Sequence, residues 1–208
     1  MFGGAGVSPM SARGFAIDRT RLRATGVVAA VLAAVVLGGD ALDAVIPAPT
    51  AGTQAIGGGV TITAASGWVL AGGTSADRSG GIVLEKGDAT LFAEVVNPQF
   101  DGSSSDIAGE VELGLRTEVA QISFGDPHQT RVSGNDTTTV LFEAIVDGAA
   151  GPAGAAGAAG NQGTVDGELV CMVVAGRAVL VEVAAPQGDL AFATADVTAM
   201  VRTVKAAR

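Results

Sequence analysis

Residues 84–96 read LEKGDATLFAEVV, and this stretch carries the clearest structural signal in the chain. Apolar side chains occupy both arms, and the triplet Lys86-Gly87-Asp88 separates them. A short polar segment with glycine between two runs of apolar and β-branched residues is typical of a β-hairpin. We therefore predict two antiparallel strands, at residues 82–84 and 89–96, joined by a tight turn.

Further strand signals lie before and after this hairpin. They cover residues 60–63, 67–70, 129–132, 138–146, 164–174 and 178–184. Turns are expected at Gly134-Asn135-Asp136 and at Ala175-Gly176-Arg177. Short links of this kind favour antiparallel pairing.

Two segments instead show the spacing of amphipathic helices. The first stripe consists of Ile107, Val111, Leu115, Val119 and Ile122, after N-cap side chains at residues 103–106. The second consists of Leu190, Ala193, Val197, Met200, Val201 and Val204. The order of strands, helix, strands and helix predicts an α+β domain, a mainly antiparallel β-sheet with two packed amphipathic helices.

The same order of elements resembles a known family of domains. An early strand carries Gly67-Trp68, the hairpin and a helix follow, and two further strand pairs precede the last helix. Over residues 60–208 the pattern resembles the Mog1/PsbP-like domains of exported or membrane-anchored proteins of actinobacterial cell envelopes. The family carries no catalytic signature, and relatives include factors that assist cell-envelope lipid transport by contacting other proteins. The resemblance therefore implies this fold and a role in protein contacts.

The N-terminal region has the layout of a membrane-targeting segment. Four arginines, Arg13, Arg19, Arg21 and Arg23, precede the apolar run TGVVAAVLAAVVLGG at residues 25–39. Arginine flanks stay in the cytoplasm, so the N-terminus is expected inside the cell and the C-terminal domain outside. The 15 uncharged residues reach only roughly 22 Å as a helix, which suits a cleaved signal peptide.

Extension of the run favours a membrane span instead. Continuing through Asp40 and Asp43 to Ile46 gives 22 residues, close to the roughly 20 that a bilayer core requires, and no A-x-A cleavage motif follows. We predict an uncleaved transmembrane signal-anchor at residues 25–46, a single pass through the cell membrane. Secretion after signal cleavage and an ordinary buried helix remain the alternatives.

This assignment divides the chain into four parts. Residues 1–24 form a cytoplasmic disordered N-terminus, residues 25–46 the anchor, residues 47–59 a flexible stalk, and residues 60–208 the extracytoplasmic α+β domain. Cys171 is the only cysteine, so no cysteine near residues 25–46 could carry a lipoprotein anchor. A single cysteine also cannot form an intramolecular disulfide. The domain must therefore be held together by its hydrophobic core, for which about 150 residues suffice.

Charge restricts the partners of this domain. Residues 47–208 hold eight Lys and Arg against 18 Asp and Glu, a balance of −10. Nucleic acids and anionic lipid surfaces attract clustered cations, so neither is an expected partner of the domain. Ten arginines against two lysines, with no tyrosine, indicate a high-GC bacterium.

Few side chains offer chemistry. His128 is the only histidine, and because no nucleophile motif accompanies it, a catalytic triad is not predicted. Cys171 lies 43 residues after His128, and this separation does not match the ligand spacing of zinc-finger-like metal sites. Since Cys171 alternates with Leu169 and Val173, a buried and inert thiol is expected.

Two pairs of carboxylates deserve comparison with glycosidase acid–base pairs, Glu110/Glu112 and Asp166/Glu168. Residues two apart leave a helix on different sides, so the first pair cannot act together. The second pair shares a face of a strand, for which simple solvation is the favoured explanation. Catalysis by either pair is not predicted.

The remaining features have structural explanations. Trp68, the only tryptophan, is expected in the core or as a lid over it. Glycine recurs at every third position over residues 148–163, but with a single proline the run is too short for a collagen helix and indicates a mobile loop. Asn135-Asp136-Thr137 matches a glycosylation sequon and also suits a hairpin turn, which is preferred.

The sequence thus predicts no catalytic residues, no metal site and no cofactor. The expected function is a non-catalytic, membrane-anchored interaction or accessory module that contacts cell-envelope proteins. The alternative is a carrier or binder of a lipid or other small apolar ligand, in a groove between sheet and helix. A carrier should show an apolar cavity of several hundred Å³, whereas an interaction module should show a filled core and an exposed patch.

Overall fold

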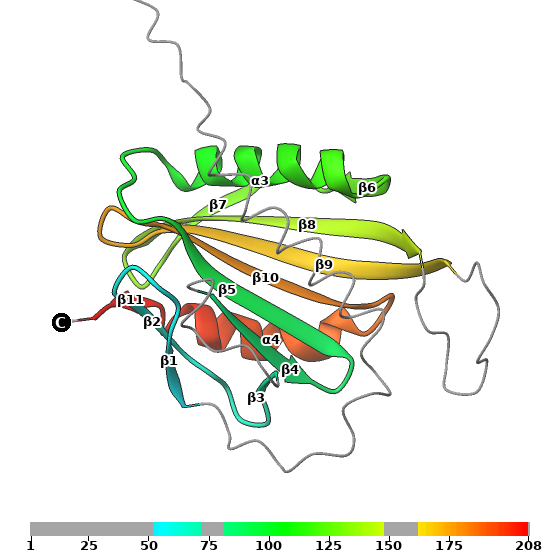
Figure 1. Cartoon of the computed structure of the whole chain (residues 1–208), viewed down its shortest axis with the longest axis horizontal. Helices are drawn as coiled ribbons and strands as arrows, with labels where there is room; N and C mark the ends of the chain where they lie inside the picture. Colours follow the sequence, from blue (N-terminus) through cyan, green and yellow to red (C-terminus); the bar gives the residue numbers. More distant parts are fainter. Residues whose placement is uncertain (1–51, 72–80, 148–161, 208) are drawn as a thin grey trace, which may run out of the picture.

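The computed structural model describes residues 52–71, 81–147 and 162–207 (Figure 1). The predicted N-terminus (residues 1–24), the anchor (residues 25–46) and most of the glycine-rich run lie outside these ranges. In the described part of the chain, neither helix is long and apolar enough to cross a membrane.

The helices and strands follow the predicted order, with three short additions. In chain order they are β1 (Thr53–Ala55), β2 (Val60–Thr63), β3 (Val69–Leu70), β4 (Ile82–Lys86), β5 (Ala89–Asn97), α3 (Ser104–Glu118), β6 (Gln121–Phe124), β7 (His128–Val132), β8 (Asn135–Asp147), β9 (Gln162–Val173), β10 (Ala178–Pro186), α4 (Leu190–Val201) and β11 (Lys205–Ala206).

An eight-stranded sheet forms the centre of the domain. Its order is β3-β4-β5-β10-β9-β8-β6, and β7 also pairs with β8. Every pairing in it is antiparallel. A smaller sheet has the order β1-β2-β11. The prediction of a mainly antiparallel sheet with two helices is therefore confirmed.

Both predicted hairpins are present, and glycine is required at their turns. Gly87 joins β4 to β5 with a φ of +58°, a conformation that side chains with a Cβ rarely adopt. Between β9 and β10 the turn is formed by Ala175 and Gly176, and Val174 and Arg177 exchange backbone hydrogen bonds across it. The turn before β8 is formed by Ser133 and Gly134, one residue earlier than predicted.

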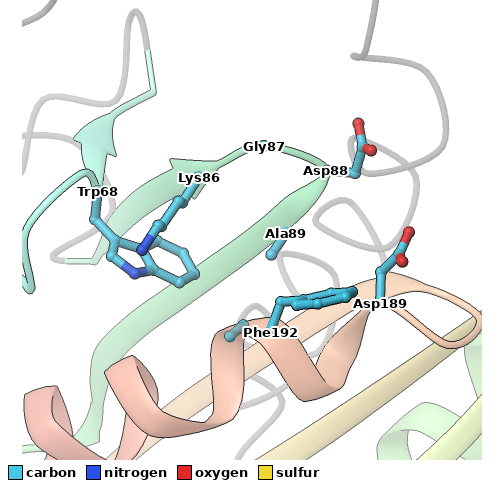
Figure 2. Close-up of a pocket in the computed structure, with 8 residues that line it drawn as sticks. Trp68, Lys86, Gly87, Asp88, Ala89, Asp189 and Phe192 are labelled. Carbon is cyan, nitrogen blue, oxygen red and sulfur yellow. The ribbon is translucent and has the colours of Figure 1, made fainter.

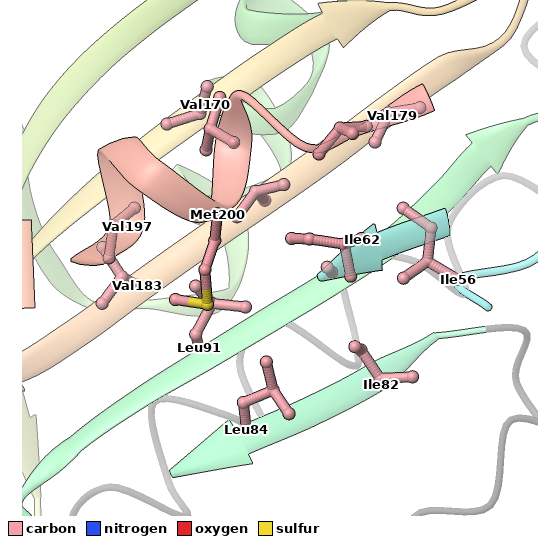
Figure 3. Packing of buried hydrophobic residues seen from close by; sticks show 14 of the residues in the cluster. Ile56, Ile62, Ile82, Leu84, Leu91, Val170, Val179, Val183, Val197 and Met200 are labelled. Atoms are coloured by element: carbon pink, nitrogen blue, oxygen red, sulfur yellow. The ribbon is translucent and has the colours of Figure 1, made fainter. Parts of the chain in front are cut away.

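The two helices cover opposite faces of the main sheet (Figure 1), and strand alternation decides which residues face which helix. In β10, Val179, Val181 and Val183 pack toward α4 and the small sheet, whereas Ala178, Leu180 and Ala184 pack toward α3. Figure 3 shows Val197 and Met200 of α4 among the buried side chains on the α4 side of the main sheet. Each fully buried large aliphatic side chain contributes about 1.5–3 kcal/mol to stability.

Helix α3 begins at the predicted cap and ends earlier than predicted. The Ser103 backbone N–H donates to Asp106 Oδ2 at 2.8 Å, and the Asp106 backbone N–H donates to Ser103 Oγ at 3.4 Å, a capping box. Val119 already has extended backbone, and Ile122 lies on β6. The assignment of these two residues to the helical stripe is wrong, because spacing alone cannot distinguish one further helical turn from a strand that returns to the sheet edge.

The predicted stalk at residues 47–59 is wrong for its described part, residues 52–59. β1 pairs with β2, and Ile56 is fully buried in the core. The Val95 backbone N–H donates to the Ile56 carbonyl at 3.0 Å, which ties the segment to β5. The ordered domain therefore begins before residue 60, because a glycine-rich turn at residues 57–59 lets the preceding residues pair back onto β2.

Candidate functional site

The structure does not bring His128 and Cys171 together. His128 begins β7, is exposed, and pairs with Thr139 on the sheet face that α4 covers in part. Cys171 faces α3 on the other side and is fully buried, as predicted. Burial raises the pKa of its thiol to about 12, with a further contribution from the negative charges of Glu112 and Glu182.

The two sequence-derived carboxylate pairs also form no joint site. Glu110 is exposed on α3, whereas Oε2 of Glu112 lies 3.9 Å from Nη2 of Arg116. Asp166 accepts a hydrogen bond from the Gly188 backbone N–H at 2.9 Å, which holds the turn before α4. Glu168 is half-buried rather than solvated, and burial raises the pKa of its carboxyl. Among the described residues, no group of three or more His, Cys, Asp or Glu could hold a metal ion.

Trp68 is a core residue, as predicted, and it also anchors a polar cluster. Its side chain is fully buried, and its indole N–H donates to Asp196 Oδ2 of α4 at 3.1 Å. Lys86, from the β4–β5 hairpin, donates to the same oxygen at 2.6 Å. The hydrogen bonds from Lys86 and Trp68 lower the pKa of Asp196. This cluster fixes the start of β3, the hairpin and α4 relative to one another.

A pocket of about 250 Å³ opens beside this cluster (Figure 2). The buried Trp68, Ala89 and Ala193 lie at its base, and the exposed Asp88 and Asp189 lie on its rim. Phe192 of α4 also lines it, and its side chain is 82% exposed. Apart from Phe192, only Leu113 and Leu141 are exposed large hydrophobics in the part of the chain that the structure describes.

Sequence reasoning did not single out Phe192. The signal that could have identified it is its position between Leu190 and Ala193 of the apolar stripe, on the side of α4 that the stripe leaves to solvent. A phenylalanine at such a position has no core to enter. Asp196, which receives the Trp68 and Lys86 hydrogen bonds, was missed because both partners lie more than 100 residues away in sequence.

Two buried glutamates form a second feature that the sequence did not predict as a site. Glu94 of β5 and Glu182 of β10 face the α3 side of the sheet, since Glu182 pairs with Phe92 and Glu94 with Leu180. Desolvation raises the pKa of Glu94 to about 7 and that of Glu182 to about 8, with the charge of Glu94 contributing to the latter. Both carboxyls therefore hold protons to unusually high pH.

A groove between α4 and the sheet lies at the other end of the helix. Its volume is about 420 Å³, and it runs along α4 over β7, β8 and β9. Valines line part of it, but most lining side chains carry hydroxyl groups or charges, including Arg131, Glu168 and Arg202. It has the size expected of a carrier's cavity but not its apolar lining.

Comparison with known proteins bears on the fold. No family model matches the chain, and no curated protein matches its sequence at a significant level. A crystal structure from Bacteroides thetaiotaomicron matches with a TM-score of 0.49 and 10% identity, over 76% of this chain and 49% of that chain. This chain thus spans about half the length of that protein.

Two further solved structures match this chain over nearly their full length. The cyanobacterial PsbP (CyanoP) of Synechocystis sp. PCC 6803 matches with a TM-score of 0.48 and 10% identity, over 79% of this chain and 98% of that chain. The Ran-binding protein Mog1p of Saccharomyces cerevisiae matches with a TM-score of 0.47 and 12% identity, over 75% and 96%. A PsbP protein and Mog1p are therefore among the structural neighbours, and such low identity leaves function open.

Proposed function

We propose that this protein is a membrane-anchored, extracytoplasmic interaction module of the bacterial cell envelope, and that it is not an enzyme. The observation that carries the proposal is the exposure of Phe192 beside the Trp68 pocket (Figure 2). Residues 25–46 supply the proposed anchor, with the arginines before them in the cytoplasm. The α+β domain then contacts other proteins at the outer face of the cell membrane.

Phe192 has the properties of an interface anchor. A phenylalanine that is 82% exposed gains about 1.5–3 kcal/mol when a partner buries it. Its position is set by the neighbouring Ala193, which is buried in the core, so little ordering is needed on binding. Aromatic residues beside a pocket dominate the energetics of many protein interfaces.

Charge around the pocket indicates the chemistry of the partner. Asp88 and Asp189 lie on the rim, while the positive charge of Lys86 is matched by Asp196 at 2.6 Å. The rim is therefore negative overall. A partner that presents an apolar side chain next to a lysine or arginine would complement it, and an envelope protein with such a loop is the proposed partner.

Site-specific crosslinking in the native bacterium tests this contact. A photoreactive residue in place of the exposed Ala191, next to Phe192, should capture the partner in the full-length protein. The adduct should be lost when Phe192→Ala or Asp189→Lys is added, because the anchor or the rim charge is then removed. A matched control is Leu113→Ala on α3, a side chain that is 64% exposed and lies on the helix of the opposite face.

The outcome distinguishes a specific contact from proximity in the envelope. Retention of the adduct in Phe192→Ala, or equal loss in Leu113→Ala, would contradict the proposed surface. The carrier alternative predicts instead that an apolar molecule co-purifies with the protein. It is less well supported, since the groove beside α4 is lined mostly by polar side chains.

A further inference from the structure

The lysines and arginines of the described residues divide into two groups. Lys86, Arg116 and Arg177 each have a partner: Asp196 at 2.6 Å, Glu112 at 3.9 Å and the Ala175 carbonyl at 3.0 Å, respectively. The side chains of Arg131, Arg202 and Lys205 have no ion pair or hydrogen bond within the part of the chain that the structure describes. Unpaired cations are unexpected in a domain with a balance of −10.

The three unpaired cations lie in one region. Arg131 and Arg202 line the groove of about 420 Å³ between α4 and strands β7–β9. Arg202 and Lys205 line an adjoining groove of about 430 Å³, and the two grooves share Ser133 and Arg202. Cations without partners therefore gather at the C-terminal end of α4, and none of the three paired cations lines either groove.

The walls of the first groove are held in place by the fold. Ser133, in the turn before β8, donates its hydroxyl to the Arg202 carbonyl at 2.8 Å, which joins the strand wall to the helix end. Val170, Val197 and Val201 line its floor and are at most 4% exposed, and the half-buried Val132 of β7 adds apolar surface at its side. The groove thus combines a narrow apolar floor of valines with guanidinium groups and hydroxyl groups at its sides.

We propose that the groove between α4 and strands β7–β9 binds a small organic anion, a carboxylate or phosphate ester with an apolar body, whose charge is held by Arg131 and Arg202. Guanidinium groups bind carboxylate and phosphate through charge-assisted hydrogen bonds. The valines accommodate the apolar body, and the hydroxyls of Thr139 and Thr198 remain for its polar substituents.

Glu168 is the one carboxyl among the described residues that line this groove. It is half-buried, and burial raises the pKa of its carboxyl. The groove lies at the opposite end of α4 from Phe192, so this ligand site is independent of the proposed protein contact.

Ligand-observed NMR on the full-length protein in phosphatidylcholine nanodiscs tests the site, with three probes. Benzyl phosphate carries both the charge and an apolar body, inorganic phosphate carries the charge alone, and benzyl alcohol carries the body alone. We expect saturable binding of benzyl phosphate, with a Kd below about 1 mM, and at least about tenfold weaker binding of the other two. Equal affinity for inorganic phosphate would overturn the assignment of the valines to an organic body.

Two sets of variants locate the binding. Arg131→Gln with Arg202→Gln should weaken benzyl phosphate binding at least about tenfold, whereas Arg116→Gln with Arg177→Gln removes the same charge elsewhere and should leave it unchanged. Thr198→Glu places a negative charge at an exposed residue that lines the groove and should also weaken binding. Its control is Ala195→Glu, an exposed position of α4 outside the groove. Absence of saturable binding, or equal weakening by a control, would overturn the proposal.

Discussion

Glu94 and Glu182 lie diagonally across the β5–β10 pair, and three of their four carboxyl oxygens are buried without a hydrogen-bond partner. Glu182 is fully buried and Glu94 is 6% exposed. A buried carboxylate without a partner is far less stable than the neutral acid. The pair is therefore accommodated in its protonated form, which makes the stability of the domain depend on pH.

The first prediction is that stability falls as the pH rises from about 5 to about 8. The folded pKa values, about 7 for Glu94 and about 8 for Glu182, lie above the ordinary value of 4.5. In this window the unfolded chain has released protons that the folded chain keeps, so the free energy of unfolding decreases with pH. Urea denaturation at a series of pH values measures this slope.

The variant Glu182→Gln tests whether the buried glutamates cause this pH dependence of stability. The amide keeps the shape but does not ionise, so the variant should be more stable than the parent at pH 8 by about 1–3 kcal/mol. The difference should shrink toward pH 5. Glu110→Gln, an exposed change on α3, should leave the pH profile unaltered. An unchanged slope in Glu182→Gln would assign the pH dependence to other groups.

The second prediction concerns the cluster of Trp68, Lys86 and Asp196. Asp196→Ala leaves the buried indole N–H of Trp68 without an acceptor and should cost about 1–3 kcal/mol. Lys86→Met removes only a partly exposed ion pair and should cost less than about 1 kcal/mol. Because Trp68 is the only tryptophan, its fluorescence should change in Asp196→Ala. If both variants lost the same stability, the ion pair between Lys86 and Asp196, and not the hydrogen bond from the indole, would account for the stabilising effect of Asp196.

The third prediction is that Cys171 is chemically quiet. The thiol is fully buried and its pKa is raised to about 12, so almost no thiolate is present at pH 8. Labelling by a thiol reagent should be slow in the folded protein and fast in urea. Cys171→Ala should cost about 1 kcal/mol. Labelling of the folded protein at the rate of a free thiol would contradict the placement of this side chain.

The fourth prediction is that the glycine-rich run can be shortened. Asp147 pairs with Gln162, so β8 and β9 form a ladder up to the ends of the run. Loop-closure free energy changes by only about 0.6 kcal/mol per doubling of loop length. Replacing residues 151–160 by a short Gly-Ser link should shift Tm by only a few degrees. A loss of cooperative unfolding would show that the run has a structural role.

The fifth prediction tests the anchor and the topology. Protease added outside wall-stripped cells should cut between the proposed anchor and β1, which begins at Thr53, because exposed linkers are the preferred sites of proteolysis. It should release a compact acidic fragment of about 150 residues. The control is the same treatment after Arg13, Arg19, Arg21 and Arg23 are changed to Gln, which should weaken the orientation. Failure of external protease to release the domain from wall-stripped cells would contradict an extracytoplasmic location.

The order of elements was predictable because it depends on local patterns. Alternation of apolar residues along β8 to β10, the glycine turn at Gly87 and the cap at Ser103 each act over a few residues. The same locality explains the errors. β1, β6 and β11 are only two to four residues long, too short to show a pattern of their own, and β6 and β11 pair with strands that are not their neighbours in sequence.

The sequence by itself determined the antiparallel α+β architecture, the burial of Cys171 and Trp68, and the acidic character of the domain. These properties follow from hydrophobic periodicity and composition. Only the tertiary structure placed Phe192 beside the Trp68 pocket, joined Glu94 to Glu182 across two strands, and gathered Arg131, Arg202 and Lys205 around adjoining grooves. Such relationships join residues dozens to more than a hundred positions apart, and packing of the whole chain decides them.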